Sequence, residues 1–315
     1  MADLSIYLFW SGMATAAIAA VLYVVYVASA AVALRAVRAQ TTAGTVTLST
    51  ATGRPNPGIG RLATSFTGIT VLFLAGQVAT RWSAVGHAPF ANLYEFTAAF
   101  GFAIAAAYLA FEAYTRNRRF GLLAMPIVLG MLVIASLFPS DIVPLIPALQ
   151  NGPLLTIHVS VMMLSYAVLT VSFCGAAIYL LQGGEGNRRF AALPSAEAAA
   201  DLAHRAVMVG FPLLGLGIAL GAWWANSAWG RYWGWDPKET AALVTWLSIV
   251  AYFHARAGTG SLAGAPGIRN IVPERIRRGW RPDPMWWLIA MWVLVMFTYF
   301  GVNLWVSGLH SYAGV

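Results

Sequence analysis

Residues 223–240 bring five tryptophans and a tyrosine together beside several charged side chains, between two long apolar runs. We call this stretch the tryptophan segment. Indole rings prefer the headgroup layer of a membrane, so part of the enrichment is explained by anchoring alone. A row of rings is also a surface on which a large flat ligand stacks. The segment therefore has two interpretations, a membrane anchor and a platform for a planar ligand, and the second is favoured by its internal order.

That order ends in the pattern of a helix start. Trp233, Gly234 and Trp235 alternate rings with a backbone-permissive glycine. Asp236 follows as the expected N-cap, because the next residue is a proline, which suits the first turn of a helix. Glu239 stands three residues after the cap and completes a capping box. The pattern predicts a helix that begins directly after the rings and holds them at its N-terminal end.

Three histidines are candidates for ligand chemistry because of their depth. His158 lies one turn inside the outer end of an apolar run, and His310 follows the last run, so the two are expected to approach a planar ligand from opposite sides. His254 lies roughly 25 Å deeper than Asp236 at about 1.5 Å per helical residue. Intramembrane ionisable residues are functional candidates, although His254 also suits a helix C-terminus beside Arg256. A structural role is favoured for the two others, His87 and His204.

A haem group matches this set of residues. Histidine is a common axial ligand of haem iron, tryptophan covers the macrocycle, and Arg231 or Lys238 can neutralise a propionate. A quinone would also stack on tryptophan, but it needs no pair of histidine ligands. Both interpretations remain open at this stage.

The composition determines the class of protein that positions these residues. Hydrophobic residues make up 59% of the chain, charged residues make up 10%, and the mean hydropathy is +0.70. These values predict an all-α, polytopic membrane bundle. Eight apolar runs are long enough for a hydrocarbon core of roughly 30 Å: 4–34, 62–80, 96–114, 122–138, 154–181, 206–225, 240–254 and 285–306.

The basic residues orient this bundle. If both termini are extracytoplasmic, the loops within 35–61, 116–119, 188–205 and 256–281 are cytoplasmic and hold 16 of the 19 basic residues. The tryptophan segment then faces the outside, and the net charge of +8 needs no nucleic acid as a partner. The first run is too long for the core of a signal peptide, so we expect it to be retained. Residues 1–315 are expected to form one membrane domain.

The lone Cys174 is expected to be a small buried residue. One cysteine excludes a CxxC thiol carrier within this chain. Any redox chemistry is therefore expected to belong to a cofactor or a partner.

Residues 229–246 resemble the WWD signature of the haem-handling proteins of cytochrome c maturation. Three further stretches, 86–95, 252–256 and 308–313, resemble the CcsA/ResC-type family of System II, whose members are called CcsB in some lineages. The likeness covers residues 62–315 and leaves only the first helix and its following loop outside. An unusually long loop between residues 258 and 284 departs from the pattern.

The resemblance implies roles for individual residues. His158 and His310 would be the external axial ligands of haem b, with the tryptophan segment against its face, through Trp229, Trp233, Trp235 and Asp236. His254 would be the transmembrane ligand of haem on its way outward. Its second ligand would come from a CcsB/ResB-like membrane subunit.

The function implied is that of the haem-handling subunit of a cytochrome c synthase, a haem lyase complex in a plasma, inner or thylakoid membrane. Haem would be presented for thioether attachment to the CxxCH segment of apocytochrome c, with a thiol-reducing, thioredoxin-like protein as a further partner. Two other functions remain. A haem transporter that serves a separate ligase would bind haem without attaching it. A quinone-binding redox subunit would keep its cofactor when both external histidines are replaced.

Overall fold

The computed structural model describes residues 1–42, 55–142, 150, 152–260, 283–306 and 308. Within these residues the chain is helical and contains no strand. Its elements are α1 (Ala2–Thr42), α2 (Pro57–Val85), α3 (Leu93–Thr115), the 3-10 turn η1 (Arg118–Phe120), α4 (Gly121–Ser136), α5 (Gly152–Gln182), α6 (Ala196–Trp229), α7 (Pro237–Gly260), α9 (Met285–Met296), the π-helical turn η4 (Phe297–Gly301) and α10 (Val302–Trp305).

The helices confirm the predicted membrane bundle. In the described part of the chain, seven helical segments are long and apolar enough to cross a membrane, the last being the continuous run Met285–Trp305. A helix also occupies the seventh predicted span, and α7 is 24 residues long. That length suffices for a core of roughly 30 Å at about 1.5 Å per residue. However, α7 is not among the seven segments that are apolar enough.

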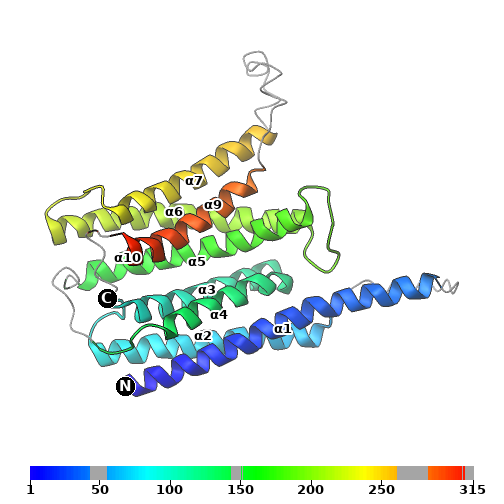
Figure 1. Cartoon of the computed structure of the whole chain (residues 1–315), viewed down its shortest axis with the longest axis horizontal. Coiled ribbons are helices and arrows are strands. Elements are labelled where there is room, and N and C mark those ends of the chain that lie inside the picture. Colours follow the sequence, from blue (N-terminus) through cyan, green and yellow to red (C-terminus); the bar gives the residue numbers. More distant parts are fainter. Residues whose placement is uncertain (43–54, 143–149, 151, 261–282, 307, 309–315) are drawn as a thin grey trace, which may run out of the picture.

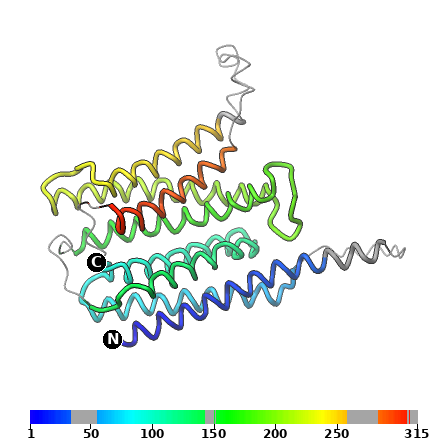
Figure 2. The backbone as a smooth tube through the Cα atoms, viewed as in Figure 1, coloured from blue at the N-terminus to red at the C-terminus, as the bar shows by residue number. Residues whose placement is uncertain are grey.

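The bundle consists of two groups of helices (Figure 1). One group holds α1, α2, α3 and α4, and the other holds α5, α6, α7 and α9 with its continuation α10. The groups meet where α3 packs against α5. The start of α1 and the end of α10 lie at the same end of the bundle, as the tube in Figure 2 also shows. The arrangement agrees with an even number of crossings.

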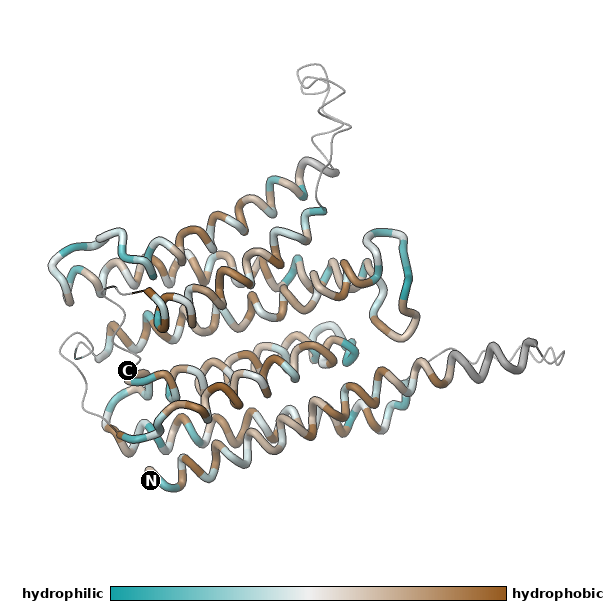
Figure 3. The backbone as a smooth tube through the Cα atoms, in the orientation of Figure 1, coloured by the Kyte–Doolittle hydropathy of each residue, from teal (hydrophilic) through white to brown (hydrophobic). Residues whose placement is uncertain are grey.

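Apolar residues face outward as well as inward. Large hydrophobic side chains are exposed along the helices, among them Val21, Leu72 and Trp305. Figure 3 shows hydrophobic residues along the lengths of the helices and hydrophilic ones mainly near their ends. A water-soluble protein rarely exposes so much contiguous apolar surface, so the pattern fits a lipid environment.

A heptad ladder joins α5 to the antiparallel α6. Ser172 and Ser165 donate hydrogen bonds to the carbonyl oxygens of Ala203 (2.8 Å) and Gly210 (3.0 Å). Each rung is seven residues from the next on both helices, the spacing of a left-handed helix pair. Small residues allow the helices to approach this closely, because a Cβ at Gly175 would come within 2.7 Å of the backbone of α6. Cys174 is buried in the same helix, as predicted.

A buried carboxylate ties the first group together. Glu112 of α3 accepts hydrogen bonds from the hydroxyls of Tyr23 (2.5 Å) and Tyr108 (2.6 Å), and also from Thr64 of α2. Arg118 donates from Nε to Thr64 at 2.8 Å and lies 3.6 Å from Glu112. A buried charge with this many donors is well satisfied, and the network fixes α1, α2, α3 and η1 against one another.

Candidate functional site

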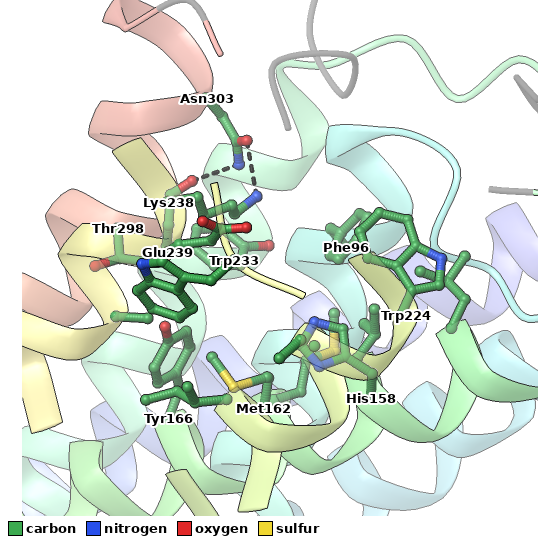
Figure 4. A pocket seen from close by; sticks show the side chains of 18 residues that line it. Phe96, His158, Met162, Tyr166, Trp224, Trp233, Lys238, Glu239, Thr298 and Asn303 are labelled. Carbon is green, nitrogen blue, oxygen red and sulfur yellow. Dashed lines mark hydrogen bonds between the residues drawn. The ribbon is translucent and has the colours of Figure 1, made fainter. Parts of the chain in front are cut away.

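A pocket opens at the end of the bundle where α1 starts and α10 ends. It lies between α5, α6, the start of α7 and the segment η4–α10, with Phe96 of α3 on its wall. The empty space between its side chains, mouth included, is about 1030 Å³. Figure 4 shows Trp233, Tyr166 and Lys238 on one side and His158 with Trp224 on the other.

His158 is the outermost rung of the heptad ladder. It stands seven residues before Ser165, and its Nδ1 lies 2.9 Å from the carbonyl oxygen of Gly217, seven residues after Gly210. A carbonyl oxygen only accepts hydrogen bonds, so Nδ1 carries the proton and the lone pair of the neutral ring is on Nε2. This is the arrangement by which proteins orient a metal-binding imidazole. His158 is thus prepared for ligation through Nε2.

Two glycines of α6 make room for side chains of α5. A Cβ at Gly221 would come within 2.6 Å of Cε1 of His158, and a Cβ at Gly217 within 2.4 Å of the sulfur of Met162. No role was predicted for either glycine. The available signal was the spacing G-x-x-x-G inside an apolar helix, which indicates close helix contact. Gly221 thus allows the ring of His158 to lie close against α6.

The tryptophans of the segment do not form one continuous floor. Trp233 and Trp224 line the pocket, and Trp224 lies parallel to His158, with 6.3 Å between ring centroids and 7° between planes. Trp229 packs edge-on against Trp224 at 4.7 Å, behind the pocket wall. Trp235 is 70% exposed and meets Trp233 edge-on at 5.8 Å. The pocket therefore has two aromatic walls that face each other, Trp224 and Trp233. Trp224 was not among the site residues predicted from the sequence.

The predicted capping box at the start of α7 is confirmed. Asp236 is buried and its carboxylate accepts from the backbone N–H of Lys238 at 3.1 Å. Glu239 accepts from the N–H groups of Asp236 (3.1 Å) and Gly234 (2.9 Å). The left-handed residue of the turn is Trp235, with φ 56°, where glycine was expected to supply the flexibility. A non-glycine residue in this region is strained, so the capping bonds hold the turn in place.

Gly234 lies against the side chain of Arg231. A Cβ there would come within 2.7 Å of the guanidinium group of Arg231, which is exposed at the rim. Lys238 lines the pocket and donates from Nζ to Oδ1 of Asn303 at 2.9 Å. The amide of Asn303 donates in turn to the carbonyl oxygen of Tyr299 at 2.6 Å. The pocket thus contains the ammonium group of Lys238, whose position is set by Asn303 of α10. The guanidinium group of Arg231 is a second cation nearby.

Of the histidines that the structure describes, His87, His204 and His254 do not line the pocket. His310 lies outside the described residues, but the backbone at Gly308 passes the rim, where a Cβ would come within 2.6 Å of Oδ1 of Asp236. His254 is exposed on α7, with Nδ1 2.8 Å from the carbonyl oxygen of Val250. His204 packs against the same helix, with Nδ1 3.2 Å from the hydroxyl of Tyr252. His87 lies with Nδ1 2.9 Å from the carbonyl oxygen of Ala88, within its own loop.

A buried ion pair supports the wall behind Trp224. Arg81 and Glu95 are each 1% exposed at the side chain and lie 2.8 Å apart. Asn92 caps α3, because its side-chain oxygen accepts from the N–H of Glu95 at 2.9 Å. The carboxylate of Glu95 does not return to the N–H of Asn92, however, but accepts from the N–H of Ala91 at 2.8 Å. The pair fixes the loop whose Phe90 packs in one apolar cluster with Trp224.

The chain is similar to known proteins over most of its length. A family model described as cytochrome C assembly protein matches residues 90–310. A protein named cytochrome c biogenesis protein CcsA from Gloeobacter violaceus is 32% identical over 315 residues, covering 81% of this chain and 87% of the relative. Proteins of the same name from Gloeothece citriformis (34% identical) and Porphyra purpurea (32% identical) each cover 81% of this chain and 88% of the relative.

Proposed function

Because the chain belongs to the cytochrome c assembly protein family, we propose that its pocket binds haem and presents it for covalent attachment to a c-type cytochrome. The relatives are named for cytochrome c biogenesis, so a role in cytochrome c maturation is the coarse part of the proposal. The finer part is that haem is the cargo of this pocket and that His158 is an axial ligand.

The geometry of His158 is the observation that carries the proposal. The bond between its Nδ1 and the carbonyl oxygen of Gly217 assigns the lone pair to Nε2. The aromatic faces of Trp224 and Trp233 suit a macrocycle, and Lys238 supplies a cation for a propionate. A quinone would use the aromatic walls as well, but it would not require an imidazole oriented for metal ligation.

His310 is proposed as the ligand on the opposite side of the iron. The backbone at Gly308 lies against Asp236, so the final residues start beside the pocket. With an imidazole on each side, the iron is held by this chain until the histidine of a CxxCH segment replaces one ligand. Haem then takes up two cysteine thiols of apocytochrome c, each S–H adding across one vinyl C=C bond to form a thioether.

The protein contributes to this reaction mainly by positioning. The pocket holds the macrocycle, and the vinyl groups remain accessible to the substrate thiols. Positioning of two reactants can lower a barrier by several kcal/mol. Asp236 and Glu239 are committed to the helix cap, which leaves them a structural role.

His254 is proposed as a ligand for haem on its way to the pocket. The side chain is exposed near the far end of α7, so a second ligand from a CcsB/ResB-like membrane subunit can reach the same iron. In this proposal the tryptophan segment faces outside and the complex, rather than this chain alone, is the synthase.

The test is the haem content of the full chain, purified in detergent with its partner subunit. His158→Ala and His310→Ala are each expected to weaken a bis-histidine haem b spectrum, measured with a pyridine haemochrome assay, and added imidazole is expected to restore it. His87→Ala is the matched control, because that histidine does not line the pocket. Unchanged haem in the double variant would refute the haem proposal and favour a quinone. Haem binding without attachment to a co-expressed CxxCH substrate would favour transport.

A further inference from the structure

The inner end of the pocket contains a phenol whose hydroxyl makes no close hydrogen bond to the residues that the structure describes. Tyr166 stands eight residues after His158 on α5, about 12 Å deeper at 1.5 Å per residue. It lines the pocket and is only 6% exposed. No hydrogen-bond partner for its hydroxyl lies among the residues that the structure describes. Buried polar groups are nearly always paired, so each exception calls for a partner that the chain itself does not supply.

Neighbouring hydroxyls already use their protons elsewhere. Thr298 donates to the carbonyl oxygen of Leu294 at 2.7 Å. Tyr299 donates to the hydroxyl of Thr97 at 3.1 Å. Both Thr298 and Tyr299 belong to the π-helical turn η4 and line the pocket. Such turns are frequent at functional sites. At this end of the pocket, in the described residues, Tyr166 is therefore the hydroxyl with a proton to offer.

The position of the Tyr166 hydroxyl makes the two sides of the pocket chemically different. Figure 4 shows the hydroxyl of Tyr166 pointing toward Trp233 and Thr298, on the side that also holds Lys238. His158 and Trp224 lie on the other side. The intervening surface is apolar, with Met162, Met163 and Ile218 among its residues. A ligand that accepts hydrogen bonds from both Tyr166 and Lys238 must bear acceptor atoms on one edge and be apolar elsewhere.

The polar edge of haem carries its two propionates, and its vinyl groups are apolar. We propose that Tyr166 donates a hydrogen bond to a propionate oxygen, so that the propionate edge faces the Tyr166 and Lys238 side and the vinyl edge faces away from it. Tyr166 is then an orienting residue for the cargo. The inference rests on the proposed function and adds to it the orientation of haem in the pocket.

The experiment compares haem with its dimethyl ester, in which both propionates are neutral. The full chain with its partner subunit is titrated with each ligand, and binding is followed by the Soret absorbance. Tyr166→Phe is expected to weaken haem binding about 10-fold, because a hydrogen bond to a charged acceptor is lost. Binding of the ester is expected to fall about threefold at most, because its neutral acceptor forms a weaker bond. Equal losses for the two ligands, or no loss for either, would overturn the inference.

Two further variants separate folding from recognition. Tyr166→Phe removes an unpaired hydroxyl, so the thermal stability of the ligand-free protein is expected to stay the same or rise. Tyr299→Phe removes a hydroxyl that is bonded to Thr97, so it should lower stability without distinguishing haem from the ester. His158→Ala should weaken both ligands equally. If it does so while Tyr166→Phe behaves as wild type, the proposed function stands and the orientation fails. If it weakens neither ligand, the proposed function itself fails.

Discussion

Replacement of Gly221 by alanine tests whether the depth of His158 against α6 controls ligation. A Cβ at this position would lie 2.6 Å from Cε1 of the imidazole, and ordinary contact begins at 3.4 Å. The ring therefore has to move away from α6 by about 0.8 Å. The hydrogen bond between Nδ1 and the carbonyl oxygen of Gly217 is 2.9 Å long. A displacement of that size takes it beyond hydrogen-bond range.

The expected changes in stability and in haem binding are different. Loss of the hydrogen bond costs about 0.5–1.5 kcal/mol. Alanine recovers roughly 0.5–1 kcal/mol over glycine inside a helix, so the free energy of unfolding should hardly change. The ligand atom, in contrast, is displaced and its tautomer is no longer fixed by Gly217. A loss of about 1.4 kcal/mol in binding free energy lowers haem affinity 10-fold. We expect at least this loss when Nε2 of His158 is displaced.

The assay is haem titration of the full chain with its partner, together with thermal unfolding of the haem-free protein. Gly130→Ala on α4 is the control, because its Cβ would meet no atom within 4 Å. The control should bind haem like the wild type. If Gly221→Ala also retains wild-type affinity and an unchanged spectrum, the reasoning about His158 is refuted. A large loss of stability would show instead that α5 and α6 cannot separate locally.

Three further predictions concern the surroundings of the pocket. Lys238→Met removes the ammonium group that Asn303 holds at 2.9 Å, and haem affinity should fall about 10-fold through loss of a charged partner; an unchanged titration would contradict this role. Glu239→Ala removes the side-chain acceptor for the N–H groups of Gly234 and Asp236, so it should lower the free energy of unfolding by about 1 kcal/mol through loss of the capping box, measured by thermal unfolding, and an unchanged melting temperature would count against it. Arg81→Met should cost about 3–5 kcal/mol because it leaves Glu95 buried without its cation. The added change Glu95→Leu should restore most of that loss in chemical denaturation, and a double variant as unstable as the single one would disprove the explanation.

Features that depend on a few neighbouring residues were predictable. The apolar runs identified the helices because a segment in lipid has to satisfy its own backbone groups. The cap at Asp236 and Glu239 was readable because all its hydrogen bonds lie within six residues. The same holds for Asn92 at the start of α3. In these places the sequence contains both partners of the interaction at a characteristic spacing.

The tryptophan segment shows where such reasoning ends. Its turn has no periodicity, so the pattern did not distinguish Trp233, which lines the pocket, from Trp235, which is exposed. Trp224 faces the pocket because α6 continues to Trp229 and turns that face toward α5. Which ring becomes a wall is decided by helix rotation and packing.

By itself, the sequence determined a helical membrane protein with a histidine and tryptophan site at one end, because composition and local spacing are sufficient for that. Only the tertiary structure decided how the site is held. His158 depends on the carbonyl of Gly217, 59 residues away, and Glu95 pairs with Arg81 across two helices. The phenol of Tyr166 became notable only when its surroundings were known. Contacts between distant residues depend on the relative register of helices, and no local pattern in a single chain specifies that register.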